Sequence, residues 1–427
     1  MVAVAGHPAT AMARTAVQVC GQLAARRLDA IGPLGAPFDP FDPLIAAAPG
    51  PTYQALHADP GVHPIGRKGF ALASYDDVRR GARAHDVLIS GQGITMLAAS
   101  LPTLLTLDEP RHGELRRLLT PLFTARRLAA LDPMMRQLTG SAIERMLDRP
   151  GADAVSELAV PLPVAVMAAL LGVPADDLKQ FQRWSDGVVA GFHADRIFAR
   201  PYTDGRQLLQ PLRSVGAVMA MHRYMRKVYV RLRRDPGDDI ISALLTSRDG
   251  GSLSDQELFW LSLTLLVAGN ETTTLIGLLL LALANHPEDY ERLRSDPSLI
   301  DGVIEETLRW GSPVQHLYRT AVSDYTVGST TIPAGSRVML LFGAVNRDPR
   351  KFPNPDEFDI DRKPTDHVGF GSGIHYCLGA RLARLEARVL VEELLPRVRR
   401  IRVLEPITWR DNPTLRGPEH LLLQLEA

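Results

Sequence analysis

A glycine-rich loop that carries one cysteine constrains this chain more than any other feature. The segment 370–379 reads Phe-Gly-Ser-Gly-Ile-His-Tyr-Cys-Leu-Gly, and the residues after it, 380–388, have the apolar spacing of a helix. A helix N-terminus offers free N–H groups and partial positive charge, and both favour a thiolate. Glycines let a loop adopt unusual backbone angles and approach a flat ligand closely. The segment therefore predicts that Cys377 binds a metal ion.

The order of residues in this loop resembles the heme-binding loop of the cytochrome P450 family. The shared pattern is Phe-x-x-Gly-x-x-x-Cys-x-Gly, with a histidine two residues before the cysteine. A lone cysteine is otherwise most often a small buried apolar residue, but five specified positions in ten residues favour the metal ligand. The resemblance implies a heme b whose iron is bound by Cys377 and which contacts Phe370, Gly371, His375 and Gly379.

Size, charge and cysteine content exclude several other classes of protein. The 427 residues contain no linker, repeat or low-complexity tract, so we expect a single domain over 35–427 after an N-terminal arm over 1–34. Acidic and basic side chains number 48 each, a balance that argues against a nucleic-acid-binding protein. The two cysteines, Cys377 and an inert Cys20, are too few for a disulfide framework and fit a reducing, cytoplasmic compartment.

Apolar periodicity predicts a mainly α fold with a minor β portion. The family resemblance implies that the heme lies between the long central helix and the helix that follows the cysteine loop. The expected helices are 75–84, 110–123, 129–147, 160–171, 174–190, 213–234, 254–284, 287–296, 300–310 and 380–395. The expected strands are 70–72, 325–327, 330–332, 337–341 and 420–425.

The longest expected helix contains an apolar stretch, 258–284, that could be mistaken for a membrane span. Asn270, Glu271 and three threonines stand at its middle, where a carboxylate in lipid costs on the order of a few kcal/mol. The sequence Ser-Asp-Gln-Glu at 254–257 fits a capping box, and Pro287 ends the helix. We therefore expect a core helix about 45 Å long and no membrane association.

The polar interruption of this helix is Ala-Gly-Asn-Glu-Thr-Thr-Thr at 268–274. It resembles the oxygen-binding groove of the family, which implies that Ala268 and Gly269 leave room above the heme and that Glu271 and Thr272 relay protons. Splitting the O–O bond needs protons delivered inside an otherwise dry pocket. The structural alternative is that the threonines bond back to the preceding helical turn and bend the helix.

Two further sets of residues match the family pattern. Glu306 and Arg309, three apart on one helical face, resemble the buried pair that holds the heme-binding loop. Many members have arginine where Glu357 stands, which leaves the third partner of this pair open, although Arg362 is close in sequence. Buried heme propionates need cations, and the family contexts suggest four residues, of which we expect at least three to serve: His112, Arg116, Arg319 and His375.

Electrons must come from another protein, because the chain has neither a dinucleotide-binding fingerprint nor an iron–sulfur cysteine cluster. The family implies ferredoxin and ferredoxin reductase as donors. Arg381, Arg384 and Arg388 repeat at helical spacing after the cysteine and could form, with Arg116 or Arg117, a basic patch for an acidic ferredoxin. An ordinary solvated helix face explains the same spacing equally well.

The resemblance, which extends from about residue 70 onward, implies a monooxygenase that inserts one atom of O2 into a C–H bond of a small organic substrate. Few charges occur at the positions that the family assigns to the substrate pocket, so we expect a nonpolar or weakly polar substrate. Peroxide-driven or rearranging heme-thiolate enzymes and a non-enzymatic heme sensor are the alternatives. The expected pocket residues are Ile94, Met96, Leu97, Val188, Val189, Phe192, Val267 and Leu317.

Overall fold

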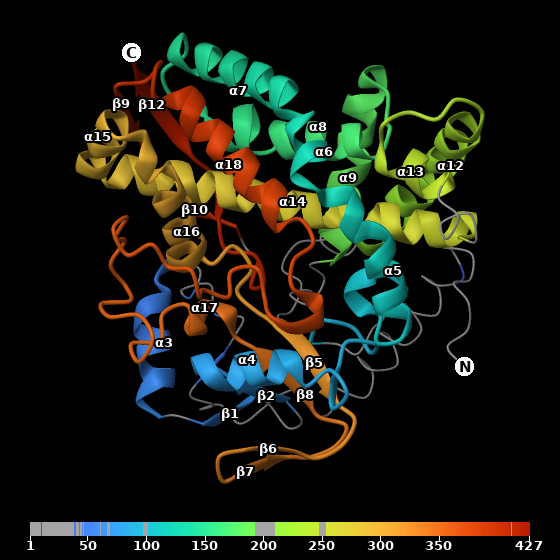
Figure 1. Ribbon diagram of the computed structural model, residues 1–427. Helices are drawn as coiled ribbons and strands as arrows, with labels where there is room; N and C mark the ends of the chain where they lie inside the picture. Colours follow the sequence, from blue (N-terminus) through green and yellow to red (C-terminus); the bar gives the residue numbers. More distant parts are fainter. Residues whose placement is uncertain are drawn as a thin grey trace.

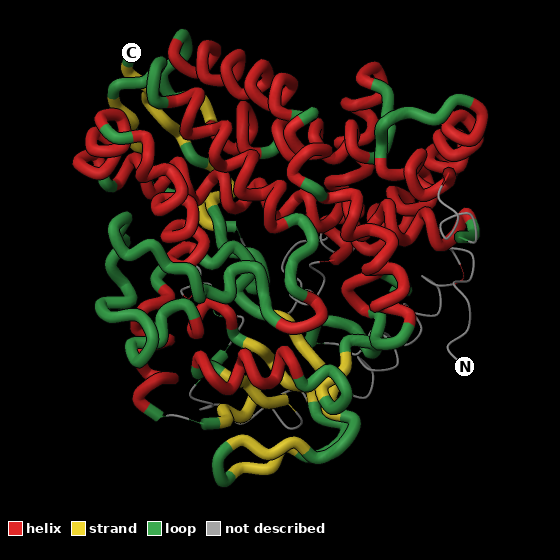
Figure 2. The backbone as a smooth tube through the Cα atoms, in the orientation of Figure 1, coloured by secondary structure: helices red, strands yellow, loops and turns green. Residues whose placement is uncertain are grey.

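The computed structural model describes residues 47–59, 61–65, 69–96, 101–192, 210–246, 253–410 and 412–427, with Thr10, Phe38, Asp39, Asp42 and Ile45. Figure 1 shows a thick helical part above a smaller part that contains the largest sheet, and Figure 2 shows the same division by secondary structure. The predicted mainly α fold with a minor β portion is confirmed. The predicted arm over 1–34, including Cys20, lies outside the described residues apart from Thr10, so the domain division stays a prediction.

All ten predicted helices are present, with ends that differ by a few residues. The helix predicted over 129–147 instead starts at Asp132. Pro133 follows directly, and proline fits the first turn of a helix but not its interior. Prediction missed four short helices, α3, α6, α13 and α17. The described α-helices are α3 (Pro49–Ala58), α4 (Tyr75–Arg83), α5 (Arg111–Leu119), α6 (Ala125–Ala129), α7 (Asp132–Leu147), α8 (Pro161–Leu170), α9 (Leu178–Phe192), α12 (Gln210–Arg234), α13 (Ile240–Thr246), α14 (Asp255–Asn285), α15 (Pro287–Ser295), α16 (Ile300–Gly311), α17 (Phe342–Val345) and α18 (Ala380–Leu394).

Shorter helical turns connect these helices. Two of them border the site described below: the 3-10 helix η1 (Leu104–Thr106) precedes α5, and the 3-10 helix η7 (Gly373–His375) lies in the cysteine loop. The others are the 3-10 helices η2 (Thr120–Phe123), η4 (Ala175–Asp177) and η6 (Pro297–Leu299) and the π-helix η3 (Val155–Ala159).

Helix α14 is the axis of the main core. Ser254 and Glu257 form the predicted capping box, in which the serine hydroxyl accepts from the Glu257 N–H and the glutamate accepts from the Ser254 N–H. Among the described residues, α14 is the one helix that is both long enough and apolar enough to cross a membrane. Most of its apolar stretch is buried against other helices. Helices α8, α16 and α18 pack along it. This burial explains why α14 is apolar on nearly all sides.

The β portion consists of one five-stranded sheet and smaller pieces. The large sheet has the order β1 (Val62–Ile65), β2 (Gly69–Leu72), β8 (Arg337–Leu340), β5 (Leu317–Ala321), β3 (Leu88–Ile89), and only β2 and β8 run parallel. In this sheet prediction found β2 and β8 but missed β1, β3 and β5. The central residue of β5 is Arg319, a residue type that ordinarily suggests a surface. The smaller pieces are β4 (Ala152–Asp153) with β12 (Leu422–Glu426) and β9 (Arg400–Val403), β6 (Tyr325–Val327) with β7 (Thr330–Ile332), and β10 (Thr408–Trp409) with β11 (Pro418–His420).

Candidate functional site

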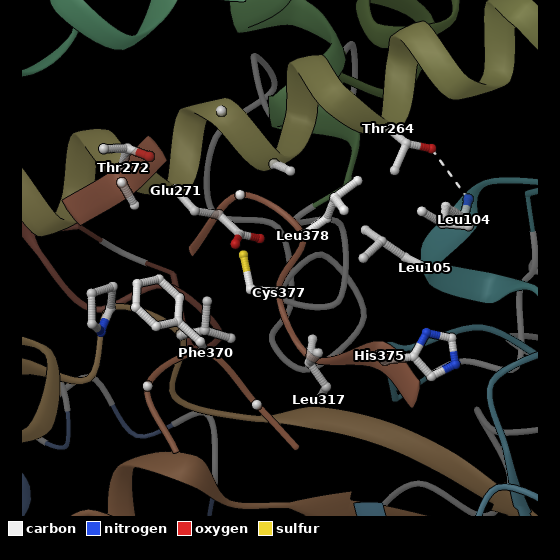
Figure 3. A pocket seen from close by; sticks show the side chains of 18 of the residues that line it. Leu104, Leu105, Thr264, Glu271, Thr272, Leu317, Phe370, His375, Cys377 and Leu378 are labelled. Atoms are coloured by element: carbon white, nitrogen blue, oxygen red, sulfur yellow. Dashed lines mark hydrogen bonds between the residues drawn. The ribbon is translucent and has the colours of Figure 1, made fainter. Parts of the chain in front are cut away.

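A cavity separates the middle of α14 from the cysteine loop. Its walls come from α14, the loop before α18, the start of β5, η1 and the N-terminal half of α5. Figure 3 shows the Cys377 sulfur and the Glu271 carboxylate projecting toward each other from the loop and from α14. The cavity brings together fourteen of the predicted site residues: Ile94, His112, Arg116, Ala268, Gly269, Glu271, Thr272, Leu317, Arg319, Phe370, Gly371, His375, Cys377 and Gly379.

The cysteine loop is shaped by its own hydrogen bonds and by two left-handed glycines. The Cys377 N–H donates to the Phe370 carbonyl (2.9 Å), which closes the loop, and Gly379 caps α18 immediately afterwards. Gly371 has φ 73°, an angle that favours glycine. At Gly373, with φ 75°, an added Cβ would lie 2.3 Å from the Ala82 carbonyl oxygen, so this glycine also lets the loop pack against α4.

The helix N-terminus does not by itself keep the Cys377 thiol deprotonated, contrary to the expectation from sequence. Burial raises the pKa of Cys377 to about 11, and the Glu271 carboxylate adds to this rise. The Gly379 N–H and the guanidinium groups of Arg116 and Arg384 lower the pKa but do not outweigh burial. Coordination to a metal ion would supply the missing stabilisation, since a metal ion binds a thiolate and displaces its proton.

A group of cationic and imidazole side chains lines the side of the cavity nearest η7. Arg319 is buried, and burial lowers its pKa to about 10; it donates to the Tyr318 carbonyl (2.8 Å). The rings of His112 and His375 lie 4.3 Å apart, and the Nε2 atom of His112 has no hydrogen-bond partner among the described residues. Burial, and then the charge of Arg319, lowers the pKa of His375 to about 2.

This group fits the heme that the sequence implies. Within the described part of the chain, no carboxylate lies within ion-pair distance of Arg319, so its buried charge lacks the partner that a heme propionate would supply. Arg116 of α5 lines the same cavity and donates to the carbonyl of Tyr376 in the cysteine loop (2.5 Å). An iron porphyrin with two carboxylates requires a thiolate ligand, close backbone approach and cationic partners. The cavity offers a thiol, glycines around it and, at one edge, arginine side chains without a carboxylate partner among the described residues.

The α14 side of the cavity carries the acid and the alcohol at its centre. Burial raises the pKa of Glu271 to about 7, and Thr272 follows it on the cavity wall. An added Cβ at Gly269 would lie 2.2 Å from Met167 Cγ, so close packing of α8 against α14 requires this glycine in addition to any need for ligand space. The Oγ1 atoms of Thr273 and Thr274 have no hydrogen-bond partner among the described residues, so these two threonines do not bond back to the preceding turn.

Glu306 and Arg309 form a buried ion pair with two contacts, Nη2 to Oε1 (2.6 Å) and Nε to Oε2 (2.7 Å), and neither side chain is exposed. Arg362 is the third partner, with Nε 3.3 Å from Glu306 Oε1. Glu357, at the position where many members have arginine, takes part through its backbone carbonyl, which accepts from Arg309 (2.9 Å). The pair therefore holds the segment before the cysteine loop through side-chain and backbone contacts.

A second polar cluster beside the loop was missed by sequence reasoning. Glu305 accepts two hydrogen bonds from Arg384 (2.5 and 2.8 Å) and lies 2.9 Å from His367 Nε2. Although burial raises the pKa of Glu305, these partners lower it to about 2 overall. The Arg384 guanidinium lies 4.6 Å from the centre of the Phe370 ring, so the cluster links α16 and α18 to the aromatic residue that begins the loop. The only sequence signal for this cluster was that Glu305 stands directly before Glu306, the acid of the predicted ion pair.

The same contacts reduce the predicted basic patch. Arg384 is paired with Glu305, and Arg388 is paired with Asp301 and Glu392. Three arginines of the expected set have no ion-paired carboxylate among the described residues: Arg116, Arg117 and Arg381. Arg381 is exposed, and Arg116 is half-buried. The patch is smaller than the helical spacing suggested.

The predicted substrate-pocket residues divide into three groups. Ile94 and Leu317 line the cavity. Met96 packs instead against the cluster that contains Tyr318 and Met339, and Val188 and Val267 are buried in the main core without lining the cavity. Leu97 and the side chains of Val189 and Phe192 lie outside the described residues. Lining residues that sequence reasoning missed include Met167, Thr264, Leu265 and Phe342.

Comparisons with known proteins agree with this geometry. The cytochrome P450 family model matches residues 72–401. A beta-dihydromenaquinone-9 omega-hydroxylase of Mycobacterium tuberculosis is 41% identical over 386 residues, which cover 89% of this chain and 76% of that protein. A vitamin D(3) 25-hydroxylase of Pseudonocardia autotrophica is 36% identical over 86% of this chain and 92% of its own length. The structure of cytochrome P450 CYP109Q5 from Chondromyces apiculatus superposes with a TM-score of 0.80 at 34% identity, covering 91% of this chain and 98% of that one.

Proposed function

The chain belongs to the cytochrome P450 family, and we propose that it hydroxylates a nonpolar or weakly polar organic molecule with electrons that come from NAD(P)H through ferredoxin reductase and ferredoxin. As a member of this family it is a monooxygenase with heme b as cofactor. The balanced reaction takes one substrate C–H bond, O2, two electrons and two protons, and it yields one alcohol and one water. The observation that carries the proposal is the acid–alcohol pair of α14: Glu271 and Thr272 line the same cavity as Cys377, and the Glu271 carboxylate points toward the sulfur.

Each part of the cavity has a task in this proposal. Heme, when bound through Cys377, supplies the redox chemistry that splits dioxygen. Its propionates would be held by Arg319, His112, Arg116 and His375. Glu271, with a pKa of about 7, can both accept and release a proton near neutral pH, and the Thr272 hydroxyl can pass that proton into the cavity. The apolar walls exclude bulk water, which limits wasteful release of partly reduced oxygen.

The substrate is proposed from the cavity and from the relatives together. The lining residues outside the cationic group are mostly Leu, Ile, Val, Phe and Met, so an ionic substrate would leave its charge without a partner. The two relatives named above act on a dihydromenaquinone and on vitamin D3, according to their names. We therefore propose an extended apolar substrate with a C–H bond to hydroxylate, such as an isoprenoid or a steroid-like molecule.

Reconstitution tests the proposal. The heme-loaded protein is combined with a ferredoxin, its reductase and NADPH, and a short-chain dihydromenaquinone and vitamin D3 are offered as probes. We expect NADPH consumption that rises with substrate and a product heavier by one oxygen atom. Product formed only with added hydrogen peroxide would replace the electron-transfer part of the proposal, and heme-ligand binding without turnover of any probe would favour a sensor.

Replacement of Thr272 tests the proton relay separately. Thr272→Ala should keep its heme but divert most of the NADPH consumption into hydrogen peroxide, because protons no longer reach the cavity in step with the electrons. Thr273→Ala is the matched control, since its hydroxyl lies one residue away and does not line the cavity. Equal coupling of product to NADPH in the two variants would remove Thr272 from the relay.

A further inference from the structure

The segment from Ser90 to Met96 forms one edge of the cavity and is held at successive points along its length. Asp108 accepts from the N–H groups of Ser90 and Gly91 (both 2.8 Å), and the Ser90 hydroxyl lies 3.1 Å from His375 Nε2. Ile94 is the residue of this segment that reaches the cavity wall. Its position decides how much room remains on that side.

Three consecutive carbonyls around Ile94 all have donors. The Ile94 carbonyl accepts from the Tyr318 N–H (2.9 Å) at the beginning of β5. The carbonyls of Gly93 and Thr95, on either side, both accept from one nitrogen of Arg337, Nη2, with 2.9 Å for Gly93. The backbone on both sides of Ile94 is thus bound to the same guanidinium group.

Arg337 reaches this segment from the other face of the sheet. It begins β8 and pairs in register with Thr320, whose hydroxyl accepts from Arg337 Nη1. Leu317 and Arg319 of β5 point to the cavity, and alternation therefore places Tyr318 and Thr320, with Arg337, on the opposite face. Arg337 is 4% exposed, and its guanidinium lies 5.6 Å from the centre of the Tyr318 ring. Packing on this face fixes the side chain and leaves it few alternative positions.

We propose that Arg337 is a positioning residue for substrate selectivity: by holding the carbonyls of Gly93 and Thr95, it sets how far Ile94 projects into the cavity. Arginine suits this task, because its rigid fork donates in several fixed directions, whereas a lysine ammonium is a single point on a flexible stem. A displacement of the Ile94 side chain by about one methyl group changes discrimination between ligands by roughly tenfold or more. The proposal concerns the wall and holds whichever apolar substrate the enzyme takes.

The first measurement is backbone hydrogen exchange in the heme-loaded protein. In Arg337→Met we expect the amides of residues 91–96 to exchange at least tenfold faster than in the wild type, while the rest of the chain is unchanged. Arg337→Lys should give an intermediate rate, which keeps the test valid should the methionine variant fold poorly. Thr320→Val is the matched control: it removes one acceptor of the same guanidinium but leaves both loop contacts, so exchange of 91–96 should stay at the wild-type rate.

The second measurement uses 4-phenylimidazole, a heme ligand of fixed size, so that it is independent of the physiological substrate. Its dissociation constant, read from the heme absorption shift, should change by about tenfold in Arg337→Met and in Ile94→Ala. Exchange of 91–96 should rise only in the first of these variants. Wild-type exchange in Arg337→Met, a uniform rise over the whole chain, or a dissociation constant within twofold of the wild type would each overturn the proposal.

Discussion

The two sides of the cavity are held by different forces. On the cysteine side, the Glu306–Arg309 pair and the Glu305–Arg384 pair fix the loop through short contacts between charged groups, and the first of these is fully buried. On the α14 side, the wall is mostly apolar packing, with the Leu104 N–H to Thr264 hydroxyl bond (3.3 Å) tying η1 to the helix (Figure 3). Charge-assisted bonds specify one geometry, whereas apolar contacts tolerate rearrangement. The geometry of the cysteine side is therefore fixed more tightly than the packing of the α14 side.

The sharpest test of this contrast removes one charge from the cysteine side. Arg309→Leu leaves the Glu306 carboxylate buried with fewer donors, and we expect the free energy of unfolding to fall by about 3–5 kcal/mol, with loss of heme. Chemical denaturation followed by heme absorption and by circular dichroism measures both effects. Arg292→Leu is the control, because Arg292 pairs with Asp361 at the surface and its removal should leave stability nearly unchanged. Equal effects of the two substitutions would contradict the claimed precision of this side.

A pH dependence tests whether all buried charges on this side are compensated. Glu386 of α18 is 1% exposed, its Oε2 has no hydrogen-bond partner among the described residues, and burial raises its pKa to about 8. The folded protein therefore keeps the proton up to a higher pH than the unfolded chain, whose carboxyl titrates near 4.5. The stability of the wild type relative to Glu386→Gln should be constant below pH 4.5, fall by a few kcal/mol up to pH 8 and then level off.

Thermal midpoints of the heme-loaded wild type and of Glu386→Gln, at a series of pH values, measure this difference. Glu291→Gln is the control, since that side chain is exposed. The thermal midpoint of the wild type minus that of Glu386→Gln should decline between pH 5 and pH 8. If it does not decline, Glu386 is ionised in the folded protein.

On the α14 side the expected effects are steric and smaller. Gly269→Ala should destabilise the protein by about 1–3 kcal/mol, because its methyl group would overlap Met167. In a double-mutant cycle with Met167→Ala, the cost of Gly269→Ala should largely disappear. Additive costs would mean that Met167 is not what requires the glycine, and ligand space in the groove would then explain it.

The smallest expected effect concerns the tie between η1 and α14. Thr264→Val preserves shape but leaves the Leu104 N–H without its acceptor, at a cost of about 1 kcal/mol. Affinity for 4-phenylimidazole should change while the spectrum of the ferrous carbonyl complex does not. Thr273→Val is the control for a threonine of α14 outside the cavity. A changed carbonyl spectrum would show that the two sides are not independent.

The difference between the sides also explains what could be predicted from sequence. The Glu306–Arg309 pair and the position of Cys377 at the cavity were identifiable because a buried ion pair and a glycine-framed cysteine loop each demand particular residue types at fixed spacing. Long helices such as α14 were identifiable because caps and apolar periodicity agree along many residues. The substrate wall was predicted poorly: Met96 and Val267 are apolar like Ile94, and only the tertiary arrangement decides which of them faces the cavity.

Other features depended on contacts between residues far apart in sequence. Arg319 could be proposed as a propionate partner, yet the strand β5 that carries it was missed, because a buried arginine looks like a surface residue until its partner is known. Arg337 gave no local signal, since its role arises only when β8 and the segment around Ile94 come together. Gly373 and Gly269 looked like residues that make space for a ligand, but the structure shows that packing against α4 and α8 requires them too.

The central claim is that the Cys377 sulfur binds the heme iron, and the ferrous carbonyl complex tests it most directly. The wild type should show the strongly red-shifted absorption band of a cysteine-thiolate ligand. Cys377→Ser should lose that band, because a serine oxygen is not a comparable donor. A wild-type complex without the red-shifted band, or a Cys377→Ser complex that retains it, would contradict the account.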